Sequence, residues 1–473
     1  MYLLILKSNK MEIVVYAQHL NHAYFYLSFF NKLNKYDEIS LYTESLSIYY
    51  TVKYSKKFKS RFNKVFLIPS RFPKQEIMKL ELDFREEKIL NYWVQYFKKP
   101  ITESTNTYLS QKNWIADKIL TKSIGFCWSG NKSTPLAFSK AVQLKGGDVF
   151  YSEITNFPKS VYFDKKGTNY YASLKDKYKE SIQKEDPSNT TFKEQLLKLK
   201  KNQKKIPQAN LNKKLKLYFI LTGLQDYLFK NGERYNLVKT IASKFKIKYK
   251  IEDYILDLID NNEWFDIHKL NLAKSSKSNI SVLVPLQVYS DTQLHVFSKY
   301  KSAIEFIKHI VSISDRNITI DIKLHPAENS KYNTIIIELI KRINLLYPNI
   351  KIVDTAQITD YDAVLTINST FGIDALLEDV KVISFGESLY SGLDFLLSYT
   401  NQFSGIRDAI EKYDSLVEKR NFNIFAKILF ENFYYFNYYG NNNIERDVDR
   451  KPYLESLKRI DKSISSVFQQ HKQ

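Results

Sequence analysis

Short apolar runs alternate with helical segments in two separate parts of this chain. In residues 11–174 and again in residues 280–400, the apolar runs have the length and composition of buried strands, and the segments between them have helical periodicity. Strands that are joined through helices pair in parallel, and the helices then cover both faces of the sheet. The chain is therefore predicted to be an α/β protein with two Rossmann-like domains. The expected strands are 12–16, 38–42, 64–68, 123–128, 147–152, 281–285, 318–324, 351–354, 363–367 and 381–385.

The chain is too long for a single core, because 473 residues normally form two or three domains. Residues 175–279 are predicted to form a basic connector with a helical segment, and residues 401–473 to form C-terminal helices. The aromatic stretch 422–439 is expected to pack across both Rossmann-like domains. Two such domains, with a catalytic cleft between them and a helical return at the end of the chain, make a GT-B-like arrangement.

The composition sets further bounds on the class of protein. Hydrophobic residues make up 44% and charged residues 26%, which is the balance of a globular protein. A single cysteine, Cys127, excludes an intrachain disulfide, and the seven scattered histidines lack metal-ligand spacing, so neither a metal nor another cofactor is expected. No apolar run is long enough for a transmembrane helix, and the first residues do not resemble a signal peptide, which predicts a cytoplasmic protein.

The chain is strongly basic, with a formal net charge of +20 and a pI near 9.4. This charge indicates either attraction to an anionic partner, such as nucleic acid, an acidic lipid surface or an acidic sugar nucleotide, or simply a composition rich in Lys, Asn, Ile and Tyr. The basic run at 198–216 is likewise either a solvated face or a membrane-binding segment. Nucleic-acid binding is the less favoured use, because the aromatic residues lie in apolar strands and helices rather than among the basic residues.

Polar turns follow two expected strands of the second domain. Hydroxyl and amide side chains at the start of a helix, together with its free N–H groups, form an anion site. A lysine and a histidine at a neighbouring strand end would complete a phosphate cradle at the carboxyl edge of the sheet, which suggests a nucleotide-bound substrate. The lysine and histidine are Lys323 and His325, and the residues at the helix start are Asn368, Ser369 and Thr370.

A set of motifs extends through roughly residues 120–395. They are Glu153-x-x-x-x-Pro158 with Asp164-x-x-Gly167-x-Asn169, Pro285-Leu-Gln287 with Asp291-x-Gln293, Lys323-x-His325-Pro326, Asn368-Ser-Thr370-x-Gly372 and Gly386-x-x-x-Tyr390. In these motifs and their order, the chain resembles the capsule polysaccharide biosynthesis (Kps-type) family, which includes retaining β-Kdo glycosyltransferases. It departs from the family in its long basic segment and in Thr155, where the family usually has glycine. These departures leave the acceptor and the sugar open.

The resemblance implies a glycosyltransferase that uses a CMP-activated ulosonic acid, either Kdo or a nonulosonic acid such as pseudaminic acid. The second domain would bind the CMP-sugar, and the first would face a capsule or other surface-glycan acceptor, which can be lipid-linked, at the inner face of the membrane. Asp291 would be the nucleophile of a retaining reaction through a covalent adduct, and Glu153 the general acid/base. No metal is implied. The implied donor-binding residues are Lys323, His325, Asn368, Ser369 and Thr370, and further candidates for substrate binding are Asn131, Asn169, Gln287 and Gln293.

Plainer interpretations of the same residues remain open. An Asp after a strand, such as Asp291, is most often a helix cap, and a Glu at a strand end, such as Glu153, often binds a neighbouring loop. His325 also fits a packed core histidine, and Ser369 and Thr370 can simply cap their helix. For the whole protein, the alternative to an enzyme is a non-catalytic scaffold of a capsule assembly complex, which is disfavoured because both candidate carboxylates are present.

Overall fold

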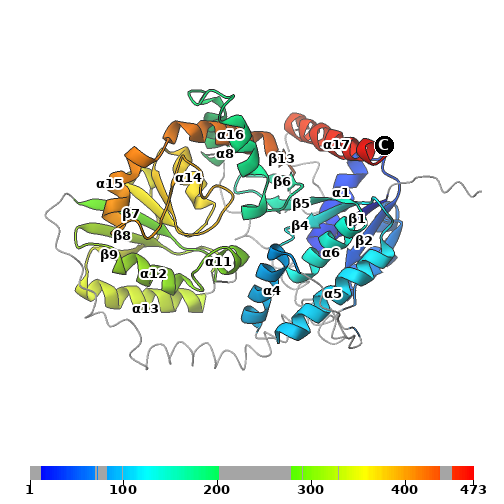
Figure 1. The fold of residues 1–473 in the computed structure, drawn as a ribbon, viewed down its shortest axis with the longest axis horizontal. Coiled ribbons are helices and arrows are strands. Elements are labelled where there is room, and N and C mark those ends of the chain that lie inside the picture. Colours follow the sequence, from blue (N-terminus) through cyan, green and yellow to red (C-terminus); the bar gives the residue numbers. More distant parts are fainter. Residues whose placement is uncertain are drawn as a thin grey trace, which may run out of the picture.

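The computed structural model describes residues 12–69, 72, 82–97, 100–201, 279–289, 291–328, 330–436 and 450–472. Two β-sheets lie in separate halves of the molecule, and helices cover both faces of each sheet (Figure 1). The C-terminal helix, drawn in red, lies in the same half as the N-terminal strands, so the chain ends in the domain in which it begins. The structure therefore has the two-domain, GT-B-like α/β architecture with a C-terminal helical return that the sequence predicts.

The first sheet is built on a parallel core. Its strands are β1 (Ile13–Tyr16), β2 (Ile39–Thr43), β3 (Lys64–Leu67), β4 (Ile124–Trp128), β5 (Asp148–Ile154), β6 (Ser160–Asp164) and β13 (Phe433–Tyr435). Their order is β13-β6-β5-β4-β1-β2-β3, in which β1 to β5 pair in parallel, whereas β6 and β13 are antiparallel to their neighbours. Because β1 lies between β2 and β4, the winding direction changes at β1, and α/β sheets bind ligands at such a point.

Apolar side chains fix the helices to this sheet. α1 (Leu20–Lys32) and α17 (Arg450–Lys472) pack on one face, in a core rich in phenylalanine that includes Phe126. α5 (Ile101–Lys118) and α6 (Ser133–Leu144) cover the opposite face. The remaining elements of this domain are α2 (Leu46–Tyr54), α3 (Lys56–Lys59), α4 (Phe84–Phe97) and the 3-10 turn η1 (Asn169–Tyr171).

The second sheet is parallel throughout. Its strands are β7 (Ile280–Pro285), β8 (Ile318–Lys323), β9 (Ile350–Val353), β10 (Ala363–Thr366), β11 (Lys381–Ser384) and β12 (Leu397–Ser398), in the order β12-β11-β10-β7-β8-β9. The winding direction changes between β7 and β10, so the turns after β7, β8 and β10 lie at one edge of the sheet. The helices are α11 (Thr292–Val296), α12 (Ala303–Ser312), α13 (Ser330–Leu346), α14 (Phe371–Leu377) and α15 (Ile406–Leu416), with the 3-10 turn η4 (Ile358–Asp360).

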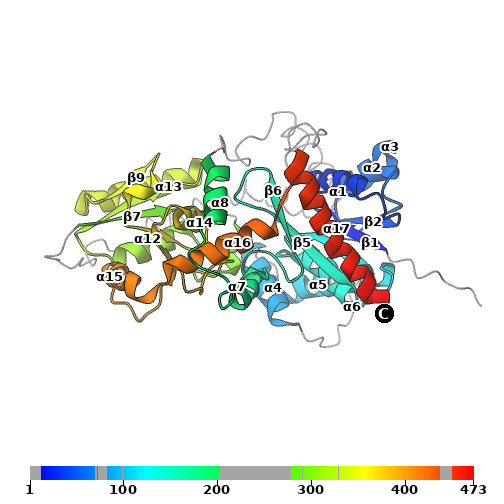
Figure 2. The same cartoon turned by 90° about the horizontal axis from the view of Figure 1, so that it is seen from above.

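Three further helices connect the domains. α7 (Leu174–Ser181) and α8 (Thr191–Lys201) pack against α16 (Phe422–Asn432), which follows the turn η5 (Lys419–Asn421) and leads the chain back to β13 and α17 (Figure 2). Their apolar side chains share one core with α14 and β11 of the second domain. The aromatic stretch therefore packs across both domains, as predicted, as far as it is described. Residues 202–278, which include most of the expected basic connector, lie outside the described residues.

Every expected strand is present, with ends shifted by one or two residues. β6, β12 and β13 are additional: the chain turns at Pro158, and β6 then pairs antiparallel with β5. Among the helices that the structure describes, none is both long and apolar enough to span a membrane.

Candidate active site

Glu153 lies near the end of β5. Its carboxylate accepts a hydrogen bond from the backbone N–H of Ile154 at 3.2 Å, and the nearby hydroxyl of Ser129 also lowers its pKa. Burial nevertheless raises the pKa of this carboxyl to about 7; the charge of Asp291 adds to the rise, and Lys132 opposes it. Near neutral pH Glu153 therefore exists in both protonation states, which is the property that a general acid or base needs.

Asp291 is the N-cap of α11, so the interpretation of this residue as a helix cap is correct. The cap does not exclude a catalytic role. One carboxylate oxygen accepts the backbone N–H of Gln293 at 2.9 Å, and the other accepts the side-chain amide of Gln287 at 3.3 Å. Burial raises the pKa of Asp291, whereas these two hydrogen bonds and the nearby His325 and His295 oppose the rise. The carboxylate is therefore held in one orientation by two donors.

Glu153 and Asp291 come from different domains, yet their charges interact. Glu153 lies near the end of β5 and Asp291 follows β7, and the packing of the two domains brings both to the domain junction. Carboxyl groups in unequal surroundings can divide chemical roles, one as acid or base and the other as nucleophile. The sequence could nominate each residue, but only the packing of the domains makes them a pair.

Gln287 and Asn368 form a chain of hydrogen bonds that leads to Asp291. The Gln287 amide donates to the Asn368 side-chain oxygen at 2.9 Å as well as to Asp291. The Asn368 amide donates to the carbonyls of Gln293 (2.8 Å), Phe297 (3.3 Å) and Glu387 (3.2 Å). Both side chains are buried and bonded within the protein. This geometry gives them a part in positioning Asp291, whereas the sequence suggests direct contact with the substrate or donor.

Lys323 lies at the start of α14, as the predicted phosphate cradle requires. Its ammonium group is 5.4 Å from the centre of the Phe371 ring, the first residue of that helix. The hydroxyl of Ser369, however, accepts the Phe371 N–H at 3.2 Å, and the carbonyls of Ser369 and Thr370 accept the next two N–H groups, those of Gly372 and Ile373. The start of α14 therefore offers fewer free N–H donors than expected. The ammonium group of Lys323 is the main group there that can bind an anion.

His325 lies between this turn and the nucleophile candidate. Its Nδ1 accepts the backbone N–H of Ala327 at 3.1 Å, so Nε2 carries the proton in the neutral ring. Burial lowers the pKa of His325, against the opposing charges of Asp291 and Glu328. The imidazole of His325 is only partly buried, lies near Asp291 and can donate through Nε2–H. His325 is therefore not a fully packed core histidine, which is the alternative interpretation of this residue.

Asn131 and Asn169 shape the turns beside Glu153. The buried Asn131 amide donates to Thr168 Oγ1 at 3.0 Å, and its oxygen accepts Arg85 Nη2 at 3.3 Å. Asn169 has a positive φ of 55°, and its N–H donates to the Tyr162 hydroxyl at 2.8 Å. The Gln293 backbone bonds to Asp291 and Asn368, whereas the structure assigns no hydrogen bond to its side chain.

Polar contacts on both sides of the carboxyl pair tie the domains together. Lys88 of α4 forms an ion pair with Glu387 of the second domain. On the other side, Asp374 of α14 accepts the Asn156 amide at 2.9 Å and pairs with Lys200 at 3.0 Å. Lys200 is only 21% exposed, because α8 packs against α14. The interpretation of the basic run as a solvated face is therefore wrong for this lysine.

The sequence motifs missed Ser129, Lys132 and Arg85. Ser129 and Lys132 follow β4, and only their position at a strand end marks them, whereas nothing in the local sequence distinguishes Arg85. Among the described residues, no group of three or more His, Cys, Asp or Glu side chains is placed to hold a metal ion.

Replacing Glu153 by Gln is expected to stabilise the fold in a pH-dependent way. The pKa of about 7 lies above the ordinary 4.5, so the folded chain loses stability as pH rises from 4.5 through 7, and this loss is complete above 7. Glu153→Gln should gain about 1–3 kcal/mol over the parent at pH 8 and little at pH 5, measured by chemical denaturation. Glu455→Gln, at an exposed site on α17, is the control. An equal gain at both pH values would contradict the burial of the charge.

Comparison with known proteins supports a family and leaves the substrate open. Among curated proteins, none matches this chain. Two similar solved structures come from Thermosulfurimonas dismutans. KpsC, beta Kdo 2,7 transferase, is 15% identical over 80% of this chain and 97% of that chain, with a TM-score of 0.35. KpsC, beta Kdo 2,4 transferase, is 13% identical over 57% of this chain and 70% of that chain, with a TM-score of 0.25. Another similar structure is UDP-GlcNAc 2-epimerase from Neisseria meningitidis, which is 12% identical over 95% of this chain and 100% of that chain, with a TM-score of 0.22. At these identities and TM-scores, the neighbours define no substrate for this chain.

A comparison with protein families gives a more specific result. Residues 141–431, more than half of the chain, match the family described as capsule polysaccharide biosynthesis protein. The matched residues include Glu153, Asp291, the Lys323-x-His325 turn and Asn368 with its neighbours. These are the positions at which the sequence motifs and the geometry of the domain junction coincide. The chain belongs to the capsule polysaccharide biosynthesis protein family.

Proposed function

We propose that this protein is a glycosyltransferase that moves an ulosonic acid, either Kdo or a nonulosonic acid such as pseudaminic acid, from its CMP donor to a capsule or surface-glycan acceptor. The observation that carries the proposal is the pairing of Glu153 and Asp291 across the domain junction, with His325 near Asp291 and Lys323 at the start of α14. Two carboxyl groups with shifted pKa values serve a glycosyl transfer, and two basic side chains serve a phosphate leaving group.

In the proposed reaction, Asp291 attacks the anomeric carbon of the donor. A carbon–oxygen bond forms to the carboxylate, and the bond to the CMP phosphate oxygen breaks, so that CMP leaves with the electron pair. Glu153 then takes the proton of an acceptor hydroxyl, whose oxygen attacks the same carbon and releases Asp291. Two inversions at one carbon give net retention. With its pKa near 7, Glu153 is ionised often enough to accept this proton at neutral pH.

Asp291→Asn separates the catalytic role of this residue from its structural one. Asn caps a helix about as well as Asp, so α11 should be kept, but an amide cannot form the glycosyl ester. We expect transfer to fall at least about 10³-fold while CMP affinity stays within about threefold of the parent. The measurement is mass spectrometry of products from CMP-Kdo and from CMP-pseudaminic acid with an oligosaccharide or lipid-linked acceptor.

The exposed Asp360→Asn, in the same domain, is the control and should retain full activity. Normal turnover by the folded Asp291→Asn protein would exclude the covalent adduct. If the parent transferred neither sugar to any acceptor, the alternative of a non-catalytic scaffold would be favoured instead.

Lys323 and His325 are proposed to bind the donor phosphate. Lys323→Met should weaken CMP binding about tenfold at both pH 5.5 and pH 8, because a charged hydrogen bond is lost. Burial places the pKa of His325 below 6.5, so its positive charge disappears as pH rises through that lower value. His325→Gln should therefore weaken binding more at pH 5.5 than at pH 8, as measured by calorimetry.

Lys341→Met removes one exposed charge from the same domain and should leave CMP affinity unchanged. Equal affinities for the parent, Lys323→Met and His325→Gln would show that the phosphate binds elsewhere.

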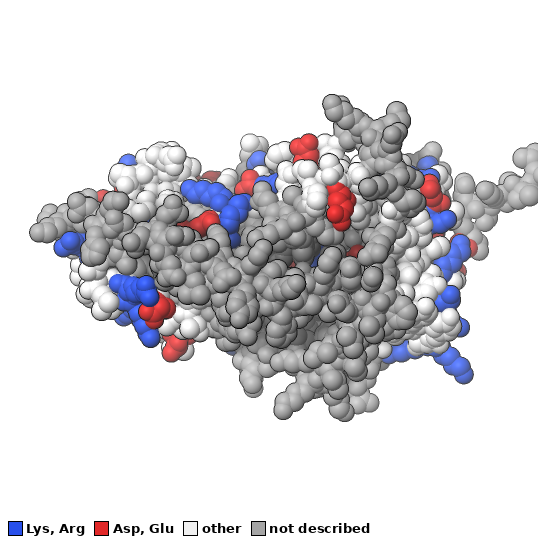
Figure 3. Space-filling model, turned by 90° about the horizontal axis from the view of Figure 1, so that it is seen from below, with Lys and Arg blue, Asp and Glu red and all other residues white. Residues whose placement is uncertain are grey.

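We also propose that the protein attaches to the inner face of an anionic membrane. The basic run at 198–216 lies largely outside the described residues, but α2 and α3 present a second basic surface. Tyr50 and Tyr54 are 44% and 64% exposed there, and their rings stack. Lys53 and Lys59 lie over the Tyr54 ring, and the exposed Lys57 lies over the ring of Tyr24. No Asp or Glu occurs between residues 46 and 75. In the face drawn in Figure 3, Lys and Arg lie near Asp and Glu at both ends of the molecule.

Neutralising Lys53, Lys57 and Lys59 together should weaken binding to vesicles that contain phosphatidylglycerol. Attraction of about 1 kcal/mol per lysine predicts a loss on the order of 100-fold at low salt, measured by co-sedimentation. Neutralising the exposed Lys118, Lys341 and Lys458 is the matched control. Equal binding by both triple variants would assign attachment to another segment.

A further inference from the structure

We propose that Arg85 is a positioning residue for Glu153, and that its helix, α4, sets the place of both carboxyl groups by holding one structural unit of each domain. This role rests on the proposed function, in which Glu153 and Asp291 carry the chemistry. Arg85 lies outside both the matched family segment and the sequence motifs.

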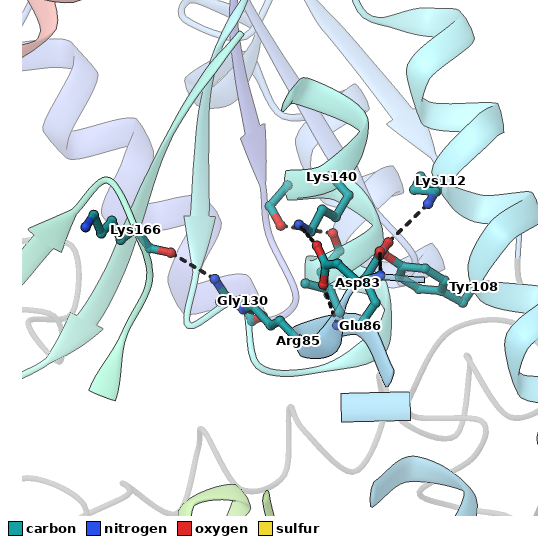
Figure 4. A network of polar contacts seen from close by, with 10 residues as sticks. Asp83, Arg85, Glu86, Tyr108, Lys112, Gly130, Lys140 and Lys166 are labelled. Carbon is teal, nitrogen blue, oxygen red and sulfur yellow. Dashed lines mark hydrogen bonds and ion pairs between the residues drawn. The ribbon is translucent and has the colours of Figure 1, made fainter. Parts of the chain in front are cut away.

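The guanidinium group of Arg85 connects two turns of the first domain. It donates to the carbonyl of Lys166 at 2.9 Å, to the carbonyl of Gly130 at 3.2 Å and to the Asn131 side chain at 3.3 Å (Figure 4). The rings of Tyr151 and Tyr171 lie 5.0 and 4.5 Å from its central carbon. A planar group with several donors and two stacking faces can fix two turns at once, which a lysine cannot do.

Glycines allow both turns to approach this group closely. A Cβ atom at Gly130 would lie 3.3 Å from the Arg85 Nη2 atom and 2.6 Å from the Tyr151 ring. At Gly167 it would lie 2.7 Å from the Tyr171 Cβ atom and 3.0 Å from the Arg85 Nη1 atom. Gly167 belongs to the family motif, so the close approach of Tyr171, together with Arg85, gives a physical reason for glycine at that position.

The turn that Arg85 holds is strained, and it includes Ser129, whose hydroxyl lies near Glu153. Ser129 has a positive φ of 61°, which is unfavourable for a residue with a side chain and persists only where neighbours enforce it. The Ser129 N–H donates to the carbonyl of Ser152 at 2.8 Å, and its carbonyl accepts the Thr168 hydroxyl at 2.8 Å. Ser152 directly precedes Glu153, so the turn is bonded to the strand end that carries this carboxyl, and the nearby Ser129 hydroxyl favours its ionised form. Arg85 therefore acts on Glu153 through Gly130 and Ser129.

The same helix contacts the unit that carries Asp291. Further along α4, Tyr92 stacks on His295 of α11 with ring centres 5.4 Å apart, and Ile89 shares a core with Val296 and Phe297. Asp291 caps α11, so α4 touches the structural support of both carboxyl groups.

The start of α4 is itself anchored. Asp83 and Glu86 form a reciprocal capping box, each side chain accepting the N–H of the other residue at 2.9 Å. Lys140 of α6 pairs with Asp83, and Lys112 and Tyr108 of α5 bind Glu86 (Figure 4). Arg85 therefore reaches the turns from a fixed helix end.

The first test needs no substrate. The charged or titratable groups near Glu153 are Asp291, Lys132, Tyr26 and Tyr162, and none of them changes when Arg85 is replaced. Displacement of the Ser129 hydroxyl, which favours the ionised form of Glu153, should therefore raise the pKa of Glu153 by half a unit or more. Carbon-13 NMR titration of glutamate-labelled protein measures this, and Glu153→Gln assigns the signal.

The variants are Arg85→Lys, Arg85→Met and Ser129→Ala, and all three should shift the Glu153 titration upward. Lys140→Met removes a cation from the same network but does not touch the turn, so it should leave the titration unchanged. If Arg85→Met does not fold, Arg85→Lys and Ser129→Ala decide. An unshifted Glu153 in folded Arg85→Lys or Ser129→Ala would overturn the proposal.

The second test uses transfer activity. Arg85→Lys should lower kcat about tenfold or more with little change in the donor KM, and it should lower activity no further in the Glu153→Gln background. If the activity losses of Arg85→Lys and Glu153→Gln multiply in the double variant, Arg85 does not act through Glu153. If the parent transfers no sugar, the proposed function fails, whereas the NMR titration still decides the role of Arg85.

Discussion

Glu153 and Asp291 are two carboxyl groups of like charge that are buried close enough to interact, and much of the surrounding structure offsets this unfavourable arrangement. Burial raises both pKa values, and the charge of Asp291 adds to the rise for Glu153. Polar groups oppose the effect: the Ser129 hydroxyl lies near Glu153, Gln287 donates to Asp291, and His325 lies near Asp291. Each donor is itself fixed by further contacts. The two carboxyl groups destabilise the fold, and the polar groups around them hold them in place. Such a trade of folding stability for activity is expected at an active site.

The placement of the pair depends on how the two domains pack. α4 contacts α11 on one side of the junction, and Asp374 binds Asn156 and Lys200 on the other. α16 then leads the chain back, and β13 joins the first sheet. A shift of one domain against the other would change the separation of the carboxyls, so the packing of the domains is part of the site. Two lysines that belong to no motif contribute to this packing: Lys88 pairs with Glu387, and Lys200 pairs with Asp374.

Local sequence was sufficient for the parallel strands, because each is a short apolar run that ends in a turn. It was insufficient for β6, whose antiparallel pairing with β5 depends on a return at Pro158 that resembles a loop. The motif residues were placed correctly at strand ends, yet the roles of Gln287 and Asn368 could not be read locally. Their amides are bonded to other parts of the protein, and hydrogen-bond partners distant in sequence leave no trace in a local pattern.

The sequence by itself determined the α/β alternation, the division into two Rossmann-like domains and the nomination of Glu153 and Asp291, because periodicity and motif order are properties of the linear chain. The tertiary structure decided which groups interact. Glu153 lies near Asp291 only after two sheets have packed, and Arg85 reaches the turn beside Glu153 only because α4 is anchored between α5 and α6. Burial and electrostatic coupling depend on distances through space, and residues far apart in the chain acquire those distances only when it folds.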